Sequence, residues 1–202
     1  MICDPQLQQI ELILASGSPR RRELMAGLGL PFRIADAYSV EECYPTDTEP
    51  HEVPRYLSQL KSKAYPGTLG EHEILVTADT VVIHSGQVIG KPRDRADALR
   101  ILGILSGSTH EVVTGLTLRS ARAATTLSET ARVTFGPLSP EQIAYYVDNY
   151  RPYDKAGAYG IQEWIGYVGI ERIEGSFYNV MGLPTRLLYT GLIDFLHTQQ
   201  NI

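Results

Sequence analysis

The sequence predicts a single α/β domain. Short apolar runs with strand character alternate with stretches of helical spacing, and two long segments of alternating polarity follow them. The chain has 202 residues, which suffice for one domain with a sizeable core, whether undivided or built as two lobes. Its 43% hydrophobic and 20% charged residues are ordinary for globular proteins and exclude the disordered and fibrous classes.

Charge and cysteine content exclude several classes of function. The net charge of -5 argues against a general nucleic-acid binder, because such proteins need a broad basic surface to neutralise phosphates. Cys3 and Cys43 lack the spacing of a disulfide framework or a zinc site, which suits a reducing cytoplasm. No apolar run approaches about 18 residues, and no basic segment precedes an apolar one near Met1, so neither a membrane span nor a signal peptide is expected.

The segment from Glu11 to Leu28 predicts a buried strand that turns abruptly into a helix. The apolar run 12–15 supplies the strand, and the small residues 16–18 supply a turn with accessible backbone N–H groups. Ser18 is expected to cap a helix that begins at Pro19 and ends near Gly29. This segment is therefore the first candidate for a ligand-binding turn.

Three arginines occupy the first turn of that helix, where the helix dipole is already positive: Arg20, Arg21 and Arg22. Each should cost a few tenths of a kcal/mol there unless an anion compensates. A helix N-terminus and guanidinium groups together favour phosphate binding. The alternative is a solvated basic face, and three consecutive arginines cannot all point one way.

The next two elements carry further charged candidates. A strand over 32–35 precedes the acidic connector SVEECYPTDTEPHE, which is either a solvated loop or a source of carboxylates for a divalent cation. A helix over 53–65 follows and places Lys61 and Lys63 near its C-terminal end. Lysines are favourable at that end of any helix, so alone they say little.

The segment 73–84, EILVTADTVVIH, predicts a strand that carries a carboxylate. Asp79 is costly to bury unless it is paired or bound to a metal, so it is a candidate base or metal ligand, with a structural hydrogen-bonding role as the alternative. A hairpin at Ser85-Gly86 then returns the chain to Gly90-Lys91-Pro92. This bend holds Lys91 in a fixed place, which suits stabilisation of phosphate charge.

The remaining elements complete the α/β pattern. We expect helices over 94–105, from Ser139 to about 149, and over 184–197, with a capping box at the second. Strands are expected over 109–119, 125–135 and 167–173. The loop 150–162 between them either binds a ligand or only turns the chain.

Six motifs, in their order and spacing, resemble the Maf family of nucleoside triphosphate pyrophosphatases: LASGSPRRREL, ADTVV, GKP, LSGSTHEVVTG, DKAGAYGIQ and GSFYNVMGLP. The resemblance covers residues 12–192. It implies one Maf-like domain over 1–202, with a mixed, twisted α/β sheet in two lobes around a central cleft, like that of inosine triphosphate pyrophosphatases (the Maf/Ham1 fold). A homodimer with its active site in that cleft is also implied.

The resemblance implies an activity and a cofactor. Family members hydrolyse a nucleoside triphosphate between the α and β phosphates, with Mg²⁺ or Mn²⁺, and release a monophosphate and pyrophosphate. By position, the phosphate-binding loop would include Ser16, Arg20 and Arg21. Asp79 would be the proton acceptor, and Glu42 and Asp79 would hold the metal.

Two lysines are implied as further site residues. Lys91 matches the lysine of the GKP motif, and Lys61 matches the helix lysine, where it would bind substrate. Ser58 and Ser62 stand where the family usually has alanines, which leaves Lys63 open as the alternative to Lys61.

Arg20, Thr80 and Gln162 resemble the branch of the family that acts on dTTP and UTP. The expected role is therefore house-cleaning: removal of canonical or modified pyrimidine nucleotides that should not be incorporated. Glu163 stands where glycine is common after YGIQ. The alternative is a nucleotide-binding regulator of septum formation without turnover, and the presence of Asp79 and Lys91 argues against it.

Overall fold

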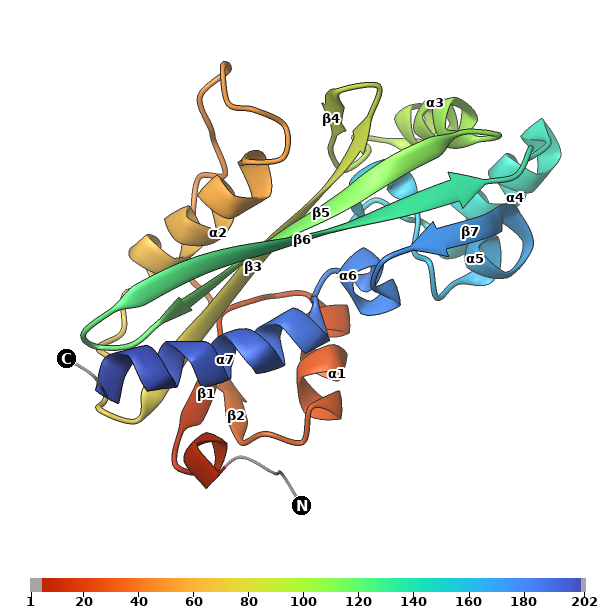
Figure 1. Ribbon diagram of the computed structural model, residues 1–202. Helices are drawn as coiled ribbons and strands as arrows, with labels where there is room; N and C mark the ends of the chain where they lie inside the picture. The colour runs from red at the N-terminus through yellow and green to blue at the C-terminus, as the bar shows by residue number, and fades with distance from the viewer. Residues whose placement is uncertain (1–4, 201–202) are drawn as a thin grey trace. The chain divides into compact units, whose positions relative to one another are not determined.

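A computed structural model describes residues 5–200 of the chain, so Cys3 lies outside the described residues. The helices of the model are η1 (Pro5–Gln8), α1 (Pro19–Gly27), α2 (Val53–Ala64), α3 (Arg95–Leu105), α4 (Pro140–Tyr150), η2 (Ala156–Ala158), α5 (Trp164–Gly169), α6 (Phe177–Met181) and α7 (Thr185–Gln200) (Figure 1). The strands are β1 (Glu11–Leu14), β2 (Phe32–Ile34), β3 (Glu73–His84), β4 (Gln87–Ile89), β5 (Thr109–Arg119), β6 (Ala124–Phe135) and β7 (Ile170–Glu174).

The chain forms two compact units. Unit 1 comprises Met1–Asp79, Thr114–Glu129 and Gly182–Ile202, and unit 2 comprises Thr80–Val113 and Thr130–Met181. The long strands β3, β5 and β6 each contribute residues to both units. Asp79 is the last residue of the unit 1 part of β3.

Unit 1 is a sheet with helices on both faces. Its strands follow the order β2-β1-β3-β5-β6, and β1 pairs in parallel with both β2 and β3. Because alternate residues of β5 point to opposite faces, Gly115 and Leu118 mark the two sides of the sheet. A Cβ at Gly115 would overlap the backbone at Pro54 of α2, whereas a Cβ at Gly191 of α7 would face Leu118. Thus α2 and α7 cover opposite faces (Figure 1).

Unit 2 contains the part of the seven-stranded sheet in which the strands follow the order β4-β3-β5-β6-β7. β4 is antiparallel to β3, and β7 is antiparallel to β6. The core includes three rings in contact: His110 stacks on Phe135 with centroids 5.5 Å apart, and Tyr159 meets Phe135 edge-on at 5.1 Å. Parallel pairs in unit 1 and antiparallel pairs in unit 2 confirm the mixed α/β sheet that was predicted.

Several local predictions are confirmed by their hydrogen bonds. The Ser18 side chain caps α1 by accepting from the Arg21 N–H, and Ser139 forms a complete capping box with Gln142 at the start of α4. Ser85 and Gly86 have φ values of 50° and 74°, as a tight hairpin between two strands requires.

The predicted strand over 167–173 is wrong in its first half. Residues 164–169 form helix α5, and β7 begins only at Ile170, opposite Phe135. Gly166 explains the difference, because its N–H closes a helical turn on the Glu163 carbonyl at 2.8 Å, and a Cβ there would overlap the Ile161 carbonyl. A short alternating pattern cannot be distinguished from one turn of helix by periodicity. Helix α6 was not predicted.

Candidate active site

The centre of the candidate site is a lysine held between two carboxylates. The Nζ atom of Lys61 lies 2.5 Å from Oδ1 of Asp79 and 3.1 Å from Oε1 of Glu42. The side chains of Lys61 and Asp79 are 14% and 10% exposed, whereas Glu42 on the connector is 46% exposed. Lys61 and Asp79 are therefore largely withdrawn from water, and the lower dielectric constant around them strengthens their attraction.

Lys61 is in this position because helix α2 lies close against the sheet. The Ser58 hydroxyl, one turn earlier, bonds to the Arg55 carbonyl at 2.8 Å and to the Thr117 hydroxyl of β5 at 2.9 Å. Thr77 of β3 donates to the Ser58 carbonyl at 2.8 Å. Ser58 is thus bonded to both strands beneath it, which the sequence alone did not reveal.

The structure distinguishes the two candidate lysines of α2. Lys61 reaches Asp79, and its own carbonyl accepts a hydrogen bond from the Tyr38 hydroxyl at 2.8 Å. Lys63, two residues further along the helix, is exposed. Lys61 is the one that joins the carboxylate cluster.

Arg21 is bound mainly to the backbone. Its Nε donates to the Gly182 carbonyl at 2.7 Å, and one Nη donates to the Ala78 carbonyl at 2.8 Å. Burial lowers the pKa of the Arg21 guanidinium, and the neighbouring Asp79 carboxylate partly offsets this effect. The guanidinium remains charged and connects α1 to the residue that precedes Asp79.

The turn before α1 has one of its N–H groups occupied. Ser18 N–H donates to the Ser16 hydroxyl at 3.2 Å. Gly17 is exposed, and a Cβ there would meet nothing within 4 Å, so the turn is open on that side. Arg20 lies close enough to Arg21 to lower the pKa of its guanidinium, so two positive charges adjoin this open turn.

Three predicted site residues belong to unit 2: Thr80, Lys91 and Gln162. Lys91 is exposed and follows β4, which returns along β3 with Ile89 opposite Val82. It lines a cavity of about 270 Å³ together with Asp97 and Arg100. The Oε1 atom of Gln162 is buried and has no hydrogen-bond partner among residues 5–200.

The loop that carries Gln162 is held by two buried side chains that sequence reasoning missed, Lys155 of the loop itself and Tyr146 of helix α4. Lys155 and Tyr146 are 8% and 0% exposed, and both side chains contact the carboxylate of Glu163. Lysine is rarely buried unless it is paired, but a single lysine in a loop gives no sign of burial in the sequence.

The carboxylate pair has the chemistry expected of a divalent cation site. Glu42 and Asp79 already converge on one cation, the Lys61 ammonium. Within residues 5–200, no group of three or more His, Cys, Asp or Glu side chains is placed to hold a metal. Mg²⁺ is often held by one or two carboxylates, with water and substrate phosphates as the other ligands, so two carboxylates fit it.

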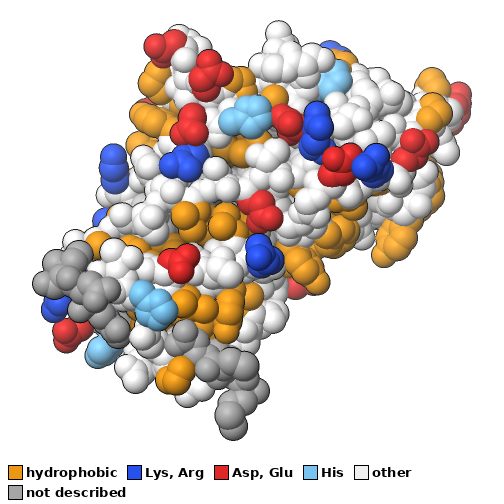
Figure 2. All heavy atoms as spheres, in the orientation of Figure 1, with side chains coloured by type: hydrophobic (Ala, Val, Ile, Leu, Met, Phe, Trp, Pro, Cys, Tyr) orange, Lys and Arg blue, Asp and Glu red, His pale blue; other side chains and the backbone are white. Residues whose placement is uncertain are grey.

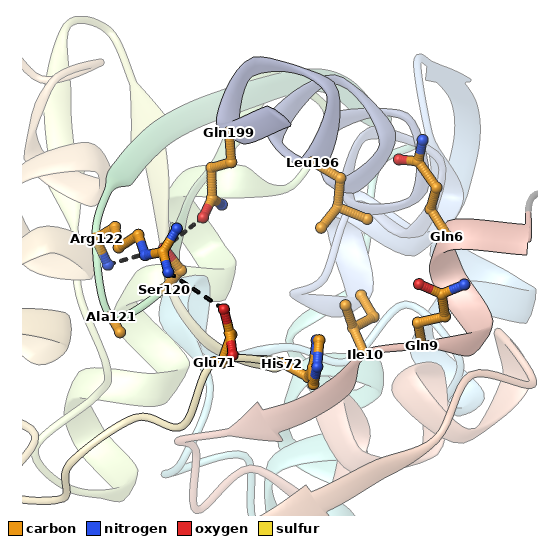
Figure 3. Close-up of a pocket in the computed structure, with 10 residues that line it drawn as sticks. All are labelled: Gln6, Gln9, Ile10, Glu71, His72, Ser120, Ala121, Arg122, Leu196 and Gln199. Carbon is orange, nitrogen blue, oxygen red and sulfur yellow. Dashed lines mark hydrogen bonds and ion pairs between the residues drawn. The ribbon is translucent and has the colours of Figure 1, made fainter. Parts of the chain in front are cut away.

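A separate cavity of about 210 Å³ in unit 1 has none of the predicted site residues in its lining (Figure 3). Its polar groups bond to one another: Arg122 pairs with Glu71 at 3.2 Å, and Ser120 donates to Gln199 at 2.8 Å. Such pairing leaves few groups to hold a ligand there.

Lysine and arginine side chains are interspersed with aspartate and glutamate on the face shown in Figure 2. None of the helices within residues 5–200 combines the length and the apolar character needed to cross a bilayer.

Comparison with known proteins gives one family. The family model described as "Maf-like protein" matches residues 11–195. A dTTP/UTP pyrophosphatase of Porphyromonas gingivalis is 50% identical over 191 residues, which are 94% of this chain and 96% of that protein. One of Flavobacterium johnsoniae is 47% identical, over 91% of this chain and 94% of that protein. The solved structure of the Staphylococcus aureus Ham1 protein aligns with a TM-score of 0.42 and 13% identity, over 62% of this chain and 71% of that one.

Proposed function

The chain belongs to the Maf family, and from this premise we propose that it hydrolyses dTTP and UTP to the monophosphate and pyrophosphate. Relatives that share about half of its residues over nine-tenths of its length bear the name of that activity. The structural observation that carries the proposal is the convergence of Glu42, Lys61 and Asp79. Cleavage of a phosphoanhydride needs little more than positioned charges and an activated water.

Asp79 accepts the proton of the attacking water. It is a buried carboxylate within strand β3, and the Lys61 ammonium and the Arg21 guanidinium lie near it. In the structure Oδ1 of Asp79 is paired with the Lys61 ammonium, so the lysine has to move before that oxygen can accept a proton. We propose that Lys61 transfers from the carboxylates to the phosphate oxygens when nucleotide binds.

Glu42 and Asp79 would hold Mg²⁺ or Mn²⁺. That metal, when bound, supplies Lewis-acid neutralisation of charge on the phosphate oxygens. If Lys61 moved to the phosphate oxygens, a divalent cation held by Glu42 and Asp79 would compensate the charge of the two carboxylates. Glu42 is the more exposed of the two and lies on an irregular connector, which allows it to adjust.

Arg20, Ser16 and Lys91 are assigned to the phosphates. Arg20 lies in the first turn of α1 beside the open turn that includes Ser16 and Gly17, where the helix dipole favours an anion. Lys91 adds a point charge from the bend after β4. Arg21 instead fixes α1 relative to Ala78, because its guanidinium donates hydrogen bonds to the backbone carbonyls of Gly182 and Ala78.

Gln162 and Thr80 are assigned to the base. The buried Oε1 of Gln162 is an acceptor without a donor in the described residues, and leaving it so costs free energy. Uracil and thymine present an imide N–H beside a carbonyl, and a carboxamide can accept from the first and donate to the second. Cytosine and adenine lack an N–H beside a carbonyl on this edge, whereas guanine and hypoxanthine have one and differ from uracil in the size of the ring system.

The test is release of pyrophosphate from a panel of nucleotides, with Mg²⁺ and with Mn²⁺. The panel contains dTTP, UTP, CTP, their 5-methyl and pseudouridine forms, ITP and 7-methyl-GTP. We expect turnover of dTTP and UTP well above that of the purines. Nucleotide binding without any turnover would instead favour a regulatory protein. The cytoplasmic location and the homodimer implied by the family resemblance remain predictions.

A further inference from the structure

A carboxylate beside Gln162 is held on both sides by buried groups. Glu163 Oε2 accepts a short hydrogen bond from the Tyr146 hydroxyl, and its Oε1 lies 3.1 Å from the Lys155 ammonium. The Glu163 side chain is 19% exposed and that of Lys155 is 9% exposed. Lys155 also pairs with Asp154 at 2.8 Å, so its ammonium keeps one carboxylate if Glu163 is removed, whereas the Tyr146 hydroxyl loses its acceptor.

These contacts tie together both ends of the loop 154–163. Lys155 lies at its start and Glu163 at its end, and the Tyr146 hydroxyl also accepts from the Gly160 N–H at 2.9 Å. A Cβ at Gly160 would come within 2.8 Å of the Glu163 carboxylate, so the backbone there is packed directly on the acid. Burial, followed by the hydrogen bond to Glu163, raises the pKa of Tyr146, which keeps its hydroxyl a donor.

The middle of the same loop is fixed on the strand that leads to Lys91. Gly157 N–H donates to the Gly90 carbonyl at 3.1 Å, and its φ of 70° favours glycine. A Cβ at Gly157 would lie 2.8 Å from Val82 of β3. The loop therefore couples the position of Gln162 to that of the residue before Lys91.

We propose that Glu163 is a positioning residue for pyrimidine recognition, since it locks the loop 154–163 and so holds the Gln162 carboxamide ready for the base. The inference rests on the proposed function and deepens it. Gln162 directly precedes Glu163, and no residue of the described chain bonds to its Oε1. A hydrogen bond from a base to this atom is favoured when the loop already holds the carboxamide in the bound position. Glu163 is not a catalytic residue, because nothing places it against the reacting atoms.

The first experiment measures KM and kcat of Glu163→Ala and Glu163→Gln for dTTP, UTP and CTP. Loss of the lock should raise KM for dTTP and UTP about tenfold, change kcat less than about threefold, and flatten the preference over CTP. Glu163→Gln keeps an acceptor for Tyr146 and should restore most of the preference. Asp148→Asn is the matched control, because Asp148 also pairs with a cation of unit 2, Arg95 at 2.6 Å, but on the surface and away from the loop.

A second readout does not depend on activity. Trp164 is the single tryptophan of the chain and directly follows Glu163. Acrylamide should quench its fluorescence more strongly in Glu163→Ala and in Tyr146→Phe than in the wild type or in Asp148→Asn, provided that melting temperatures show folded protein. If Glu163→Ala does not fold, Tyr146→Phe, which removes only the hydroxyl, takes its place in both experiments.

The outcomes separate the two proposals. A wild-type protein that turns over dTTP, with unchanged KM, preference and quenching in Glu163→Ala, would overturn the positioning role alone. A wild-type protein that does not turn over dTTP would overturn the proposed function, and with it the role in recognition. A raised KM together with stronger quenching supports both.

Discussion

Lys61 is the residue on which the interpretation of the site depends most. Its ammonium lies between Glu42 and Asp79, in the place where the chemistry of a pyrophosphatase calls for a divalent cation. The lysine balances the charge of both carboxylates in the structure, and we propose that it leaves them when a metal binds. This competition can be measured.

Replacement of Lys61 by methionine should raise the affinity for Mn²⁺ in the absence of nucleotide. The carboxylate pair then lacks its internal cation, and we expect about tenfold tighter binding, equivalent to about 1.4 kcal/mol, with a loss of turnover. Isothermal titration of Mn²⁺ measures the affinity. Lys63→Met is the matched control, because Lys63 is exposed on the same helix. Unchanged Mn²⁺ affinity in Lys61→Met would show that the lysine and the metal do not compete.

Asp79→Asn should abolish turnover while nucleotide affinity stays within about tenfold. A carboxamide cannot accept the proton of the attacking water, and general bases typically contribute about 10²- to 10⁴-fold to kcat. Turnover of dTTP and equilibrium binding of the same nucleotide give the two quantities. Normal turnover in this variant would refute the assignment of Asp79 as the base.

His110 should make the stability of the protein depend on pH. Burial lowers the pKa of His110 to about 4, from an ordinary value of 6.5, and its Nε2 bonds to the Tyr159 hydroxyl at 2.8 Å. The unfolded chain therefore binds the proton first as pH falls. The contribution of His110 is complete above pH 6.5 and is lost progressively toward pH 4.

Urea unfolding at pH 7 and pH 5 tests this dependence. His110 should account for a loss of about 2 kcal/mol in the free energy of unfolding between the two values. His110→Gln should remove that part of the slope, whatever its own cost in stability, whereas His51→Gln, at an exposed position, should retain it. An equal slope in His110→Gln and the wild type would contradict the burial of a neutral imidazole.

Among the elements, helix α2 is the one whose placement the site requires. It carries Lys61 and lies so close to β5 that only a glycine fits beneath it, since a Cβ at Gly115 would overlap the backbone of Pro54 and Arg55. The buried hydroxyl of Ser58 adds bonds to β3 and β5. The distance between α2 and the sheet therefore determines whether the Lys61 ammonium can contact the Asp79 carboxylate.

Gly115→Ala should move α2 and disturb the site. Overpacking of this kind typically costs about 1–3 kcal/mol, and a displaced Lys61 should also lower kcat. Gly103→Ala is the control: a Cβ at Gly103 of α3 meets nothing within 4 Å, and alanine should stabilise a helix by about 0.5–1 kcal/mol. Thermal unfolding and dTTP turnover report the two effects. A Gly115→Ala protein as stable and active as the wild type would show that α2 does not need this close contact.

At the scale of the whole molecule, the sequence predicted the elements with distinctive end signals best. Caps at Ser18 and Ser139 and the hairpin at Ser85-Gly86 are local chemistry, so they are visible in a single chain. The segment from Trp164 to Gly169 was misassigned because its helix depends on contacts of Gly166 with residues outside the pattern. The family assignment is confirmed over residues 11–195.

The site shows the same division. The sequence singled out Asp79, because a carboxylate in an apolar strand needs a partner, and the structure pairs it with Lys61. Its role as a base or metal ligand stays a prediction. The backbone role of Arg21 and the enclosure of Glu163 by Tyr146 and Lys155 were not predictable. Both contacts join residues that are far apart in the sequence, and the spacing of residues along the chain does not indicate which distant residues meet in the fold.

The central claim is that the chain cleaves dTTP between its α and β phosphates, with Asp79 as the base. ³¹P NMR of dTTP incubated with the protein and Mg²⁺ tests it most directly, with Asp79→Asn as the matched sample. We predict dTMP and pyrophosphate as the products of the wild-type protein and unchanged dTTP with the variant. The appearance of dTDP and inorganic phosphate, or equal product formation by Asp79→Asn, would contradict the account.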